Sequence, residues 1–384
     1  MSKKKMMLIV PMLHQGGFER VCVTTARLLE PYYEVTIVIF SAKDIAYDIH
    51  GLQVMDLHMG SVEGKLGKIC NVLRRSRRVS RLKKELGIDI AYSFGPTANL
   101  VNVFSRSRGQ VWCGVRSYMD MGNPGMLKLF CRRAHRIISC SAVMEKKLRE
   151  QFGCHSVETL YNPFDIASLR QQAQKEERIP FDDDCRVIVS MGRQDDVKGF
   201  WHLLKSFSLV HERYGDTRLL IVGEGDFQEY WRLADELGVG DAVSFPGVKK
   251  NPFPYLKRGC MYVMTSINEG FPNVLVEAMA LGKPVISTNC MTGPAEILSD
   301  DFERVNGQEA YLDCEYGILI PNLDARKDLN AETITEEERR LARQMERLLS
   351  DRALYEKYAR AAEERAARFS NQAYVEAVRR MAEE

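Results

Sequence analysis

The chain lacks any apolar run approaching the roughly 20 residues that a membrane-spanning helix needs. The apolar run after Lys5 is also too short for the central region of a secretory signal peptide. We therefore expect a cytoplasmic protein that is at most peripheral on the inner face of the cell membrane. With 384 residues, 45% of them hydrophobic and 28% charged, the chain is long enough for two globular domains.

Paired cysteine motifs are missing as well. The ten cysteines include no Cys-x-x-Cys pair, and most of them fall within apolar runs. This pattern predicts reduced, buried thiols, with metal or redox chemistry as the alternative, and we assign the cysteines no function.

Charge is distributed unevenly, although the net charge is only +2. Residues 1–180 contain 28 Lys and Arg against 16 Asp and Glu, and the remainder contains 26 against 36. The basic half is expected to meet an anionic partner.

Short apolar runs alternate with segments of helical length along the whole chain. Such runs predict strands buried on both faces, the pattern of a parallel sheet wound by helices. The predicted strands are 6–11, 35–40, 88–94, 111–115, 137–141, 157–160, 186–191, 219–222, 243–245, 261–265 and 284–288, and helices are predicted at 200–214, 227–237 and 273–281. We predict an α/β fold with two Rossmann-like, doubly wound domains that face each other across a cleft at the carboxyl ends of their strands.

The expected domains are 1–170 and 185–365, joined by a polar linker at 171–184. Residues from 336 onward have helical spacing, and the helix expected at 366–384 would cross back to the first domain.

Two strand-to-helix loops have the composition of phosphate-binding loops. Gly16 and Gly17 follow the first strand and open an amphipathic helix, so backbone can approach a phosphate at the start of that helix. Arg193 and Lys198 follow the first strand of the second half, where their two cations would neutralise a diphosphate. Either loop alone would more often be an ordinary solvent-facing turn.

Two glutamates flank the start of a later helix. Glu269 lies just before the Gly270-Phe271-Pro272 turn, and Glu277 lies about one turn inside the helix for which Asn273 is the expected N-cap. Carboxylates fixed on a rigid element suit the hydroxyls of a sugar and of a ribose, although a solvated Glu and a capping Glu would give the same spacing. Together with the two loops, they indicate a site for a nucleoside diphosphate sugar.

These motifs together resemble the retaining glycosyltransferases of family 4, which have the two-domain GT-B fold. The resemblance covers nearly the whole chain, and it is the ordered set of motifs that is specific. The motifs are Gly16-Gly17, Tyr161-Asn162-Pro163-Phe164-Asp165, Gly192-Arg193 with Lys198, Val222-Gly223-Glu224-Gly225, Phe245-Pro246-Gly247-Val248, the two glutamates, and Thr292-Gly293-Pro294-Ala295-Glu296-Ile297.

The resemblance implies a role for each matched residue. Arg193 and Lys198 would bind the diphosphate, Glu277 the ribose and Glu269 the donor sugar, and Arg193, Lys198 and Glu269 would be catalytic. The remaining donor-binding residues that it implies are Gly16, Gly17, Gly192, Gly247, Val248, Gly270, Phe271, Pro272, Asn273 and Val274. The turn at Gly247 and Val248 would offer backbone to the base, and the amides of residues 271–274 would contact the sugar or the phosphate.

The implied activity is transfer of a hexose or N-acetylhexosamine, with retained configuration, from a nucleoside diphosphate sugar to a glycan hydroxyl. UDP is the commonest nucleotide of the family. The leaving diphosphate would itself help to deprotonate the acceptor, so neither a metal ion nor another cofactor is expected. A sugar-nucleotide-binding protein or a nucleotide-sugar epimerase of the same fold stays open as an alternative.

One position departs from the family pattern. Many relatives have a histidine after the strand that here ends at Val115, whereas this chain has Arg116 and Ser117. Either of these residues, or His14 beside the glycine pair, is a candidate for contact with acceptor or donor. A structural ion pair is the alternative role for Arg116, and a packing or surface role is the usual one for a lone histidine such as His14.

A basic amphipathic segment runs from Lys65 to Lys84 in the half expected to bind the acceptor. Arg132, Arg133 and Arg136 add to its charge. A solvated helix face and docking on an anionic membrane are both open, and docking would suit a lipid-linked acceptor of the kind used for capsule, O-antigen or another surface glycan. Nucleic acid is not expected, because no binding module accompanies the charge.

Overall fold

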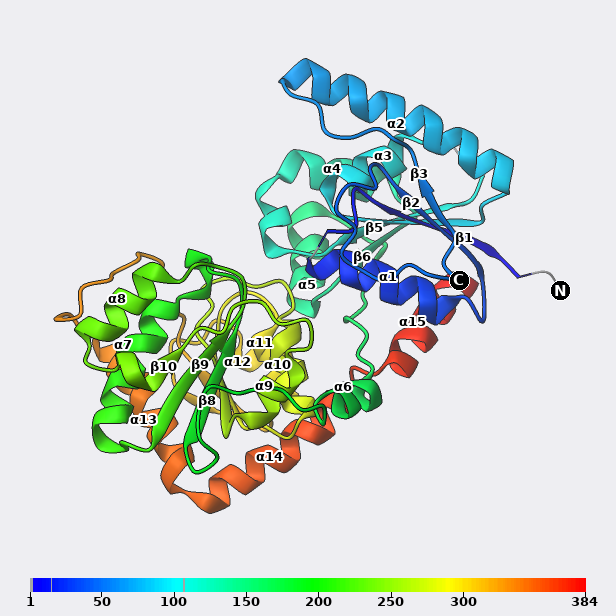
Figure 1. Cartoon of the computed structure of the whole chain (residues 1–384). Helices are drawn as coiled ribbons and strands as arrows, with labels where there is room; N and C mark the ends of the chain where they lie inside the picture. Colours follow the sequence, from blue (N-terminus) through cyan, green and yellow to red (C-terminus); the bar gives the residue numbers. More distant parts are fainter. Residues whose placement is uncertain (1–2, 15, 106–107) are drawn as a thin grey trace. The chain divides into compact units, whose positions relative to one another are not determined.

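The structure, a computed structural model, describes residues 3–14, 16–105 and 108–384 (Figure 1). It divides into two compact units, one formed by residues up to Pro163 together with Asn371–Glu384, and the other by Phe164–Ser370. The division precedes the expected domain end at residue 170. The expected linker lies inside the second unit, where Asn251 Nδ2 donates to the Gln172 carbonyl at 2.9 Å and Lys257 Nζ donates to Gln174 Oε1 at 2.5 Å.

The first unit is a sheet of seven parallel strands in the order β3-β2-β1-β4-β5-β6-β7. The strands are β1 (Lys5–Val10), β2 (Glu34–Ile39), β3 (Val54–Asp56), β4 (Ile90–Phe94), β5 (Gln110–Val115), β6 (Arg136–Ser139) and β7 (Val157–Thr159). The helices are α1 (Gly17–Leu29), α2 (Lys65–Leu86), α3 (Pro96–Phe104), the 3₁₀ turn η1 (Tyr118–Gly122), α4 (Pro124–Arg133), α5 (Ala142–Phe152) and α15 (Asn371–Glu383).

Both faces of this sheet are buried under helices, which explains the continuous apolar runs. Within β1, Leu8 lies in a core shared with α1 and α15, whereas its neighbour Ile9 lies in a core shared with α2 and α3 (Figure 1). Successive side chains of a strand point to opposite faces, so a strand covered on both sides must be apolar at every position.

The second unit is a second seven-stranded sheet, in the order β10-β9-β8-β11-β12-β14-β13. The strands are β8 (Arg186–Met191), β9 (Thr217–Val222), β10 (Val243–Ser244), β11 (Met261–Met264), β12 (Val285–Thr288), β13 (Leu312–Asp313) and β14 (Ile318–Ile320), of which β13 alone is antiparallel to its neighbour. The helices are α6 (Ile166–Gln172), η2 (Asp196–Lys198), α7 (Phe200–Arg213), α8 (Gln228–Glu236), η3 (Gly240–Ala242), α9 (Phe253–Arg258), α10 (Asn273–Ala280), α11 (Pro294–Leu298), α12 (Phe302–Val305), α13 (Glu336–Ser350) and α14 (Arg352–Ala367).

The predicted α/β class with two doubly wound sheets is confirmed. Strands β3, β13 and β14, each two or three residues long, were not predicted. All ten cysteines are free thiols, and six of them are buried as expected, but Cys70 is exposed on α2. Every helix among the described residues is too short or too polar to span a bilayer.

Candidate functional site

The candidate residues of the second unit gather at one edge of its sheet. Strands β8, β9, β10, β11 and β12 are parallel, so their carboxyl ends lie at the same edge. Arg193 and Lys198 follow β8, Gly247 and Val248 follow β10, and the segment from Glu269 into α10 follows β11. This is the edge at which open parallel sheets bind ligands.

Lys198 and Glu269 are in direct contact. The Lys198 ammonium donates to Glu269 Oε1 at 2.6 Å, and the two side chains are 25% and 15% exposed. A Cβ at Gly192 would lie 3.2 Å from Lys198 Cδ, so the absence of a side chain there lets the lysine stem cross the loop. An anion that binds the Lys198 ammonium therefore either displaces the Glu269 carboxylate or shares the ammonium with it.

Arg193 is exposed, and within the described chain it makes no hydrogen bond or ion pair. The backbone on either side of it is fixed, because Gly192 N–H donates to the Val222 carbonyl at 3.0 Å and Gln194 N–H donates to the Glu224 backbone carbonyl at 2.6 Å. A Cβ at Gly223 would lie 1.7 Å from the Gly192 carbonyl oxygen, so this crossing of two loops requires glycine. The result is a guanidinium on an anchored loop with all of its donors available to a ligand.

The start of α10 corrects one expectation. Asn273 is the first residue of the helix rather than its N-cap, and the cap position is Pro272, which makes no side-chain cap hydrogen bond. Glu277 lies one turn inside the helix and is only 3% exposed. Burial raises the pKa of the Tyr262 hydroxyl, and the charges of Glu269 and Glu277 raise it further.

The turn before α10 is held by the loop that follows β12. Thr292 N–H donates to the Glu269 carbonyl at 2.7 Å, and Thr292 Oγ1 donates to the Gly270 carbonyl at 2.6 Å. Gly293 has φ +101°, and a Cβ there would lie 2.5 Å from Pro272 Cδ. The Thr-Gly-Pro motif thus fixes the backbone of residues 269–272, a role that the sequence did not reveal.

The side chain of Phe271 is buried against Phe369, with ring centroids 5.4 Å apart. Only the backbone of Phe271 is therefore available to a ligand at this turn.

Aromatic side chains pack on Phe245, two residues before Gly247. Phe245 stacks on Phe227 at 4.9 Å, and Trp231 meets Phe245 edge to face at 5.0 Å. Val248 and Trp231 remain 49% and 37% exposed, and Gly247 has φ +74°. The turn therefore offers apolar surface as well as backbone to a planar ligand, and the aromatic residues from α8 were not foreseen.

In the first unit the glycine pair is fixed by Tyr47, another residue that the sequence did not single out. The Tyr47 hydroxyl accepts from Gly16 N–H at 2.8 Å and donates to the Gly16 carbonyl at 2.6 Å. The Gly16 amide is thus bonded to Tyr47 in this structure. Gly17 begins α1, and a Cβ there would meet nothing within 4 Å, so this position is open. His14 Nδ1 lies 3.2 Å from the Asp44 carbonyl oxygen.

Arg116 is occupied within the first unit. Its guanidinium donates to Asn162 Oδ1 and lies 3.4 Å from the Tyr92 hydroxyl and 3.5 Å from the Leu160 carbonyl oxygen. The backbone N–H groups of Arg116 and Ser117 both donate to Asp120 Oδ2 at 3.3 Å. Burial raises the pKa of this carboxyl even though it accepts both bonds. The structure therefore gives Arg116 the bracing role that the sequence left open.

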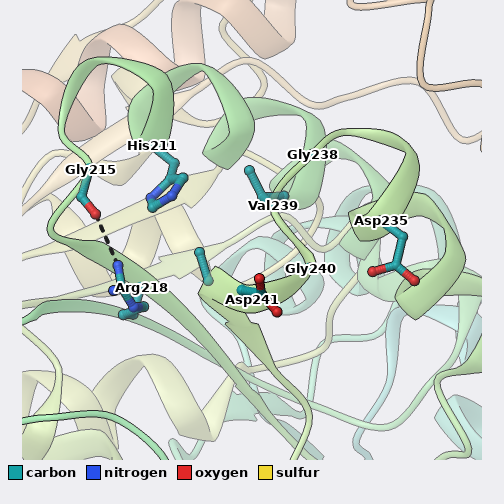
Figure 2. A pocket seen from close by; sticks show the side chains of 9 residues that line it. His211, Gly215, Arg218, Asp235, Gly238, Val239, Gly240 and Asp241 are labelled. Carbon is teal, nitrogen blue, oxygen red and sulfur yellow. Dashed lines mark hydrogen bonds between the residues drawn. The ribbon is translucent and has the colours of Figure 1, made fainter.

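A hollow of about 440 Å³ lies at the opposite edge of the second sheet (Figure 2). It adjoins the amino end of β9, where Arg218 donates to the Gly215 carbonyl at 3.0 Å, and its other lining residues are His211, Asp235, Gly238, Val239, Gly240, Asp241 and Ala242. None of the residues expected in the site lies there.

Comparison with known proteins finds similarity to glycosyltransferases. Residues 171–309 match the family model described as Glycosyl transferases group 1. An uncharacterized glycosyltransferase of Methanocaldococcus jannaschii is 35% identical over 205 residues, which are 51% of this chain and 50% of that relative. The N-acetylgalactosamine-N,N'-diacetylbacillosaminyl-diphospho-undecaprenol 4-alpha-N-acetylgalactosaminyltransferase of Campylobacter jejuni is 26% identical over 334 residues, 83% of this chain and 86% of that protein.

Among solved structures, Anabaena HepE in complex with UDP and glucose superposes with a TM-score of 0.73 at 19% identity, covering 98% of this chain and 99% of that one. The matched family segment contains Arg193, Lys198, Glu269 and Glu277. The resemblance to GT-B glycosyltransferases is thereby confirmed, for the fold over nearly the whole chain and for the family model over residues 171–309. Alignment with the first relative spans only half of its length.

Proposed function

We propose that this protein is a retaining glycosyltransferase of family 4 that transfers a hexose or N-acetylhexosamine from a nucleoside diphosphate sugar to a hydroxyl of a lipid-linked glycan. The observation that carries the proposal is the carboxyl edge of the second sheet. There Arg193, which has no partner among the residues that the structure describes, and the Lys198–Glu269 contact lie on adjacent loops. Two cations and a carboxylate are the groups that a diphosphate joined to a polyol requires.

The proposal assigns Arg193 and Lys198 to the diphosphate, Glu269 to hydroxyls of the sugar and the buried Glu277 to the ribose. The apolar turn at Val248 and the backbone at Gly247 are assigned to the base. UDP is the nucleotide that we propose, since a structurally similar protein, HepE, has been solved with UDP and glucose. The first unit is assigned to the acceptor, and the diphospho-undecaprenol in the name of the Campylobacter relative supports a lipid-linked one.

In the proposed reaction the bond from the anomeric carbon to the diphosphate oxygen breaks. The bond to the acceptor oxygen forms on the same face of the sugar, so configuration is retained. The acceptor proton passes to an oxygen of the leaving diphosphate, whose charge Arg193 and Lys198 stabilise. No enzyme nucleophile, metal ion or cofactor is required by this scheme.

The test is incubation of the full-length protein with radiolabelled UDP-hexoses and UDP-N-acetylhexosamines and a polyprenyl-diphosphate-linked glycan. Label should move into the lipid fraction, and the new linkage should have the anomeric configuration of the donor. Glu269→Gln should lower the transfer rate and weaken donor binding, because the charged acceptor for the sugar hydroxyls is lost.

Two outcomes would contradict the proposal. Saturable donor binding without transfer to any acceptor would favour a sugar-nucleotide-binding protein without transferase activity. Interconversion of the free nucleotide sugars would favour a nucleotide-sugar epimerase of the same fold.

A further inference from the structure

Helix α2 has two apolar stripes, and one of them faces solvent. Its inner stripe includes Val79 and Leu82, which are buried in the core under the first sheet. Its outer stripe is formed by Leu66, Ile69 and Leu73, which are 80%, 59% and 42% exposed. The spacing of three and four residues places these three side chains on one face of the helix. Val62, 47% exposed in the preceding loop, adds to them.

Basic side chains continue and flank this stripe. The exposed cations of α2 are Lys65, Lys68, Arg74, Arg77, Arg78, Arg81 and Lys84. Between Lys65 and Lys84 the chain has no Asp or Glu, and Glu63 and Glu85 lie just outside these limits. The exposed surface of α2 therefore combines an apolar stripe in the first half of the helix with cations along its whole length.

Three of the cations expected on this surface are occupied elsewhere. Lys83 is buried and donates to Asn102 Oδ1 at 2.7 Å, and Arg75 is buried over the ring of Phe40 at 4.4 Å. Arg136 pairs with Glu158 and Glu384. The basic surface is consequently narrower than the sequence predicted. It consists of the exposed cations of α2, and Arg132 and Arg133 of α4 are also exposed.

The stripe is mounted rigidly. Asn71 Nδ2 donates to the Gly60 carbonyl at 2.8 Å, and Arg75 Nε donates to the Met59 carbonyl at 2.9 Å, which ties the preceding loop to the helix. Leu66, Ile69 and Leu73 therefore lie in solvent on a helix that Asn71 and Arg75 tie to the preceding loop.

The chemistry of the stripe selects its partner. A second copy of this chain would bring two rows of cations together, which opposes association through this face. A basic helix that presents large aliphatic side chains beside its cations matches the interface of an anionic bilayer, whose head groups attract the cations while its acyl chains accept the apolar groups.

We propose that α2 is a membrane-insertion element. Val62, Leu66, Ile69 and Leu73 enter the acyl boundary of an anionic bilayer, and Arg77, Arg81 and Lys84 contact its head groups. The proposal rests on the exposure and charge of α2 and does not require the glycosyltransferase assignment.

Co-flotation of the full-length protein with vesicles tests it. Binding to vesicles of phosphatidylcholine with phosphatidylglycerol should exceed binding to phosphatidylcholine alone by at least tenfold. The triple variant Leu66→Ser, Ile69→Ser, Leu73→Ser should lose about tenfold in partitioning at unchanged charge. Tyr32→Ser, which removes another exposed apolar side chain of the first unit, is the matched control and should bind like wild type.

Insertion is separated from simple adsorption by a fluorophore on Cys70, the exposed cysteine on α2. Its emission should shift to the blue on anionic vesicles and be quenched by a lipid-borne quencher, whereas a Cys70→Ser protein treated with the same reagent gives the background.

A triple variant that binds as wild type does, or a Cys70 probe that stays in a water-like environment, would overturn the proposal. So would a dimer in sedimentation experiments without lipid that the triple variant abolishes, since the stripe would then be a self-association surface. Transfer to a soluble acceptor should be the same in the triple variant and wild type, which keeps this test independent of the proposed activity.

Discussion

Arg193→Ala is the perturbation that isolates the proposed diphosphate site. The side chain is exposed and, in the described structure, has no protein partner, so its removal breaks no contact of the fold. Exposed substitutions of this kind change the free energy of unfolding by about 0.5 kcal/mol or less. Any loss of activity therefore comes from the missing guanidinium and not from unfolding.

The expected loss follows from the role of Arg193 in stabilising the leaving group. Removing one preorganised donor from developing negative charge costs about 2.7 to 4 kcal/mol, which corresponds to a fall in turnover of roughly 100- to 1000-fold. The assay is initial-rate transfer from a radiolabelled donor, with thermal unfolding measured on the same samples. Arg218→Ala, at the opposite edge of the same sheet beside the hollow in Figure 2, is the control and should keep near-normal turnover. An Arg193→Ala protein within threefold of wild type would refute the assignment of this residue.

Three further predictions concern other contacts. Lys198→Ala should lower turnover about 100-fold. It should also lower the free energy of unfolding, measured by urea titration, by about 1 kcal/mol, because the partly exposed Glu269 carboxylate loses its partner. Adding Glu269→Gln should restore stability but not turnover, and recovery of both would argue against the role assigned to Lys198. Gly293→Ala should lower the free energy of unfolding by at least about 2 kcal/mol and weaken donor binding measured by calorimetry. Gly307→Ala is the control: Gly307 has φ +71° and no atom within 4 Å of an added Cβ, so the substitution should cost only backbone strain of about 1 kcal/mol. Burial lowers the pKa of Lys83 from 10.5 to about 7, so between these values the unfolded chain holds a proton that the folded chain lacks. Stability relative to Lys83→Met should therefore rise with pH from 7 to 9 and be constant below 7, and parallel urea midpoints across that range would contradict it.

The fold could be predicted because burial on both faces of a strand leaves a local trace. Leu8 and Ile9 point to opposite cores, and both must be apolar, so the run that contains them reveals a covered strand without knowledge of its neighbours. Strand β13 has no such trace, because only its pairing with β14 defines it.

The candidate site could be predicted as far as the residues that carry charge or begin a helix. Its supports depend on distant segments that meet only in the folded chain. The bond between Tyr47 and Gly16, and the bond from Thr292 Oγ1 to the Gly270 carbonyl, join residues with no regular spacing in the sequence. The residue type of Asn273 favours a cap position, which predicts a helix that begins at residue 274. The helix begins at Asn273 itself, with Pro272 at the cap position.

The central claim is that the carboxyl edge of the second sheet binds the diphosphate of an activated sugar. Calorimetric titration of wild type and Arg193→Ala with UDP and with uridine tests it directly, with the diphosphates of the other nucleosides as a specificity panel. The account predicts that a nucleoside diphosphate binds far more tightly than the nucleoside, and that Arg193→Ala weakens the diphosphate at least tenfold while uridine binds unchanged. Equal affinities of wild type and Arg193→Ala for every nucleoside diphosphate would contradict it.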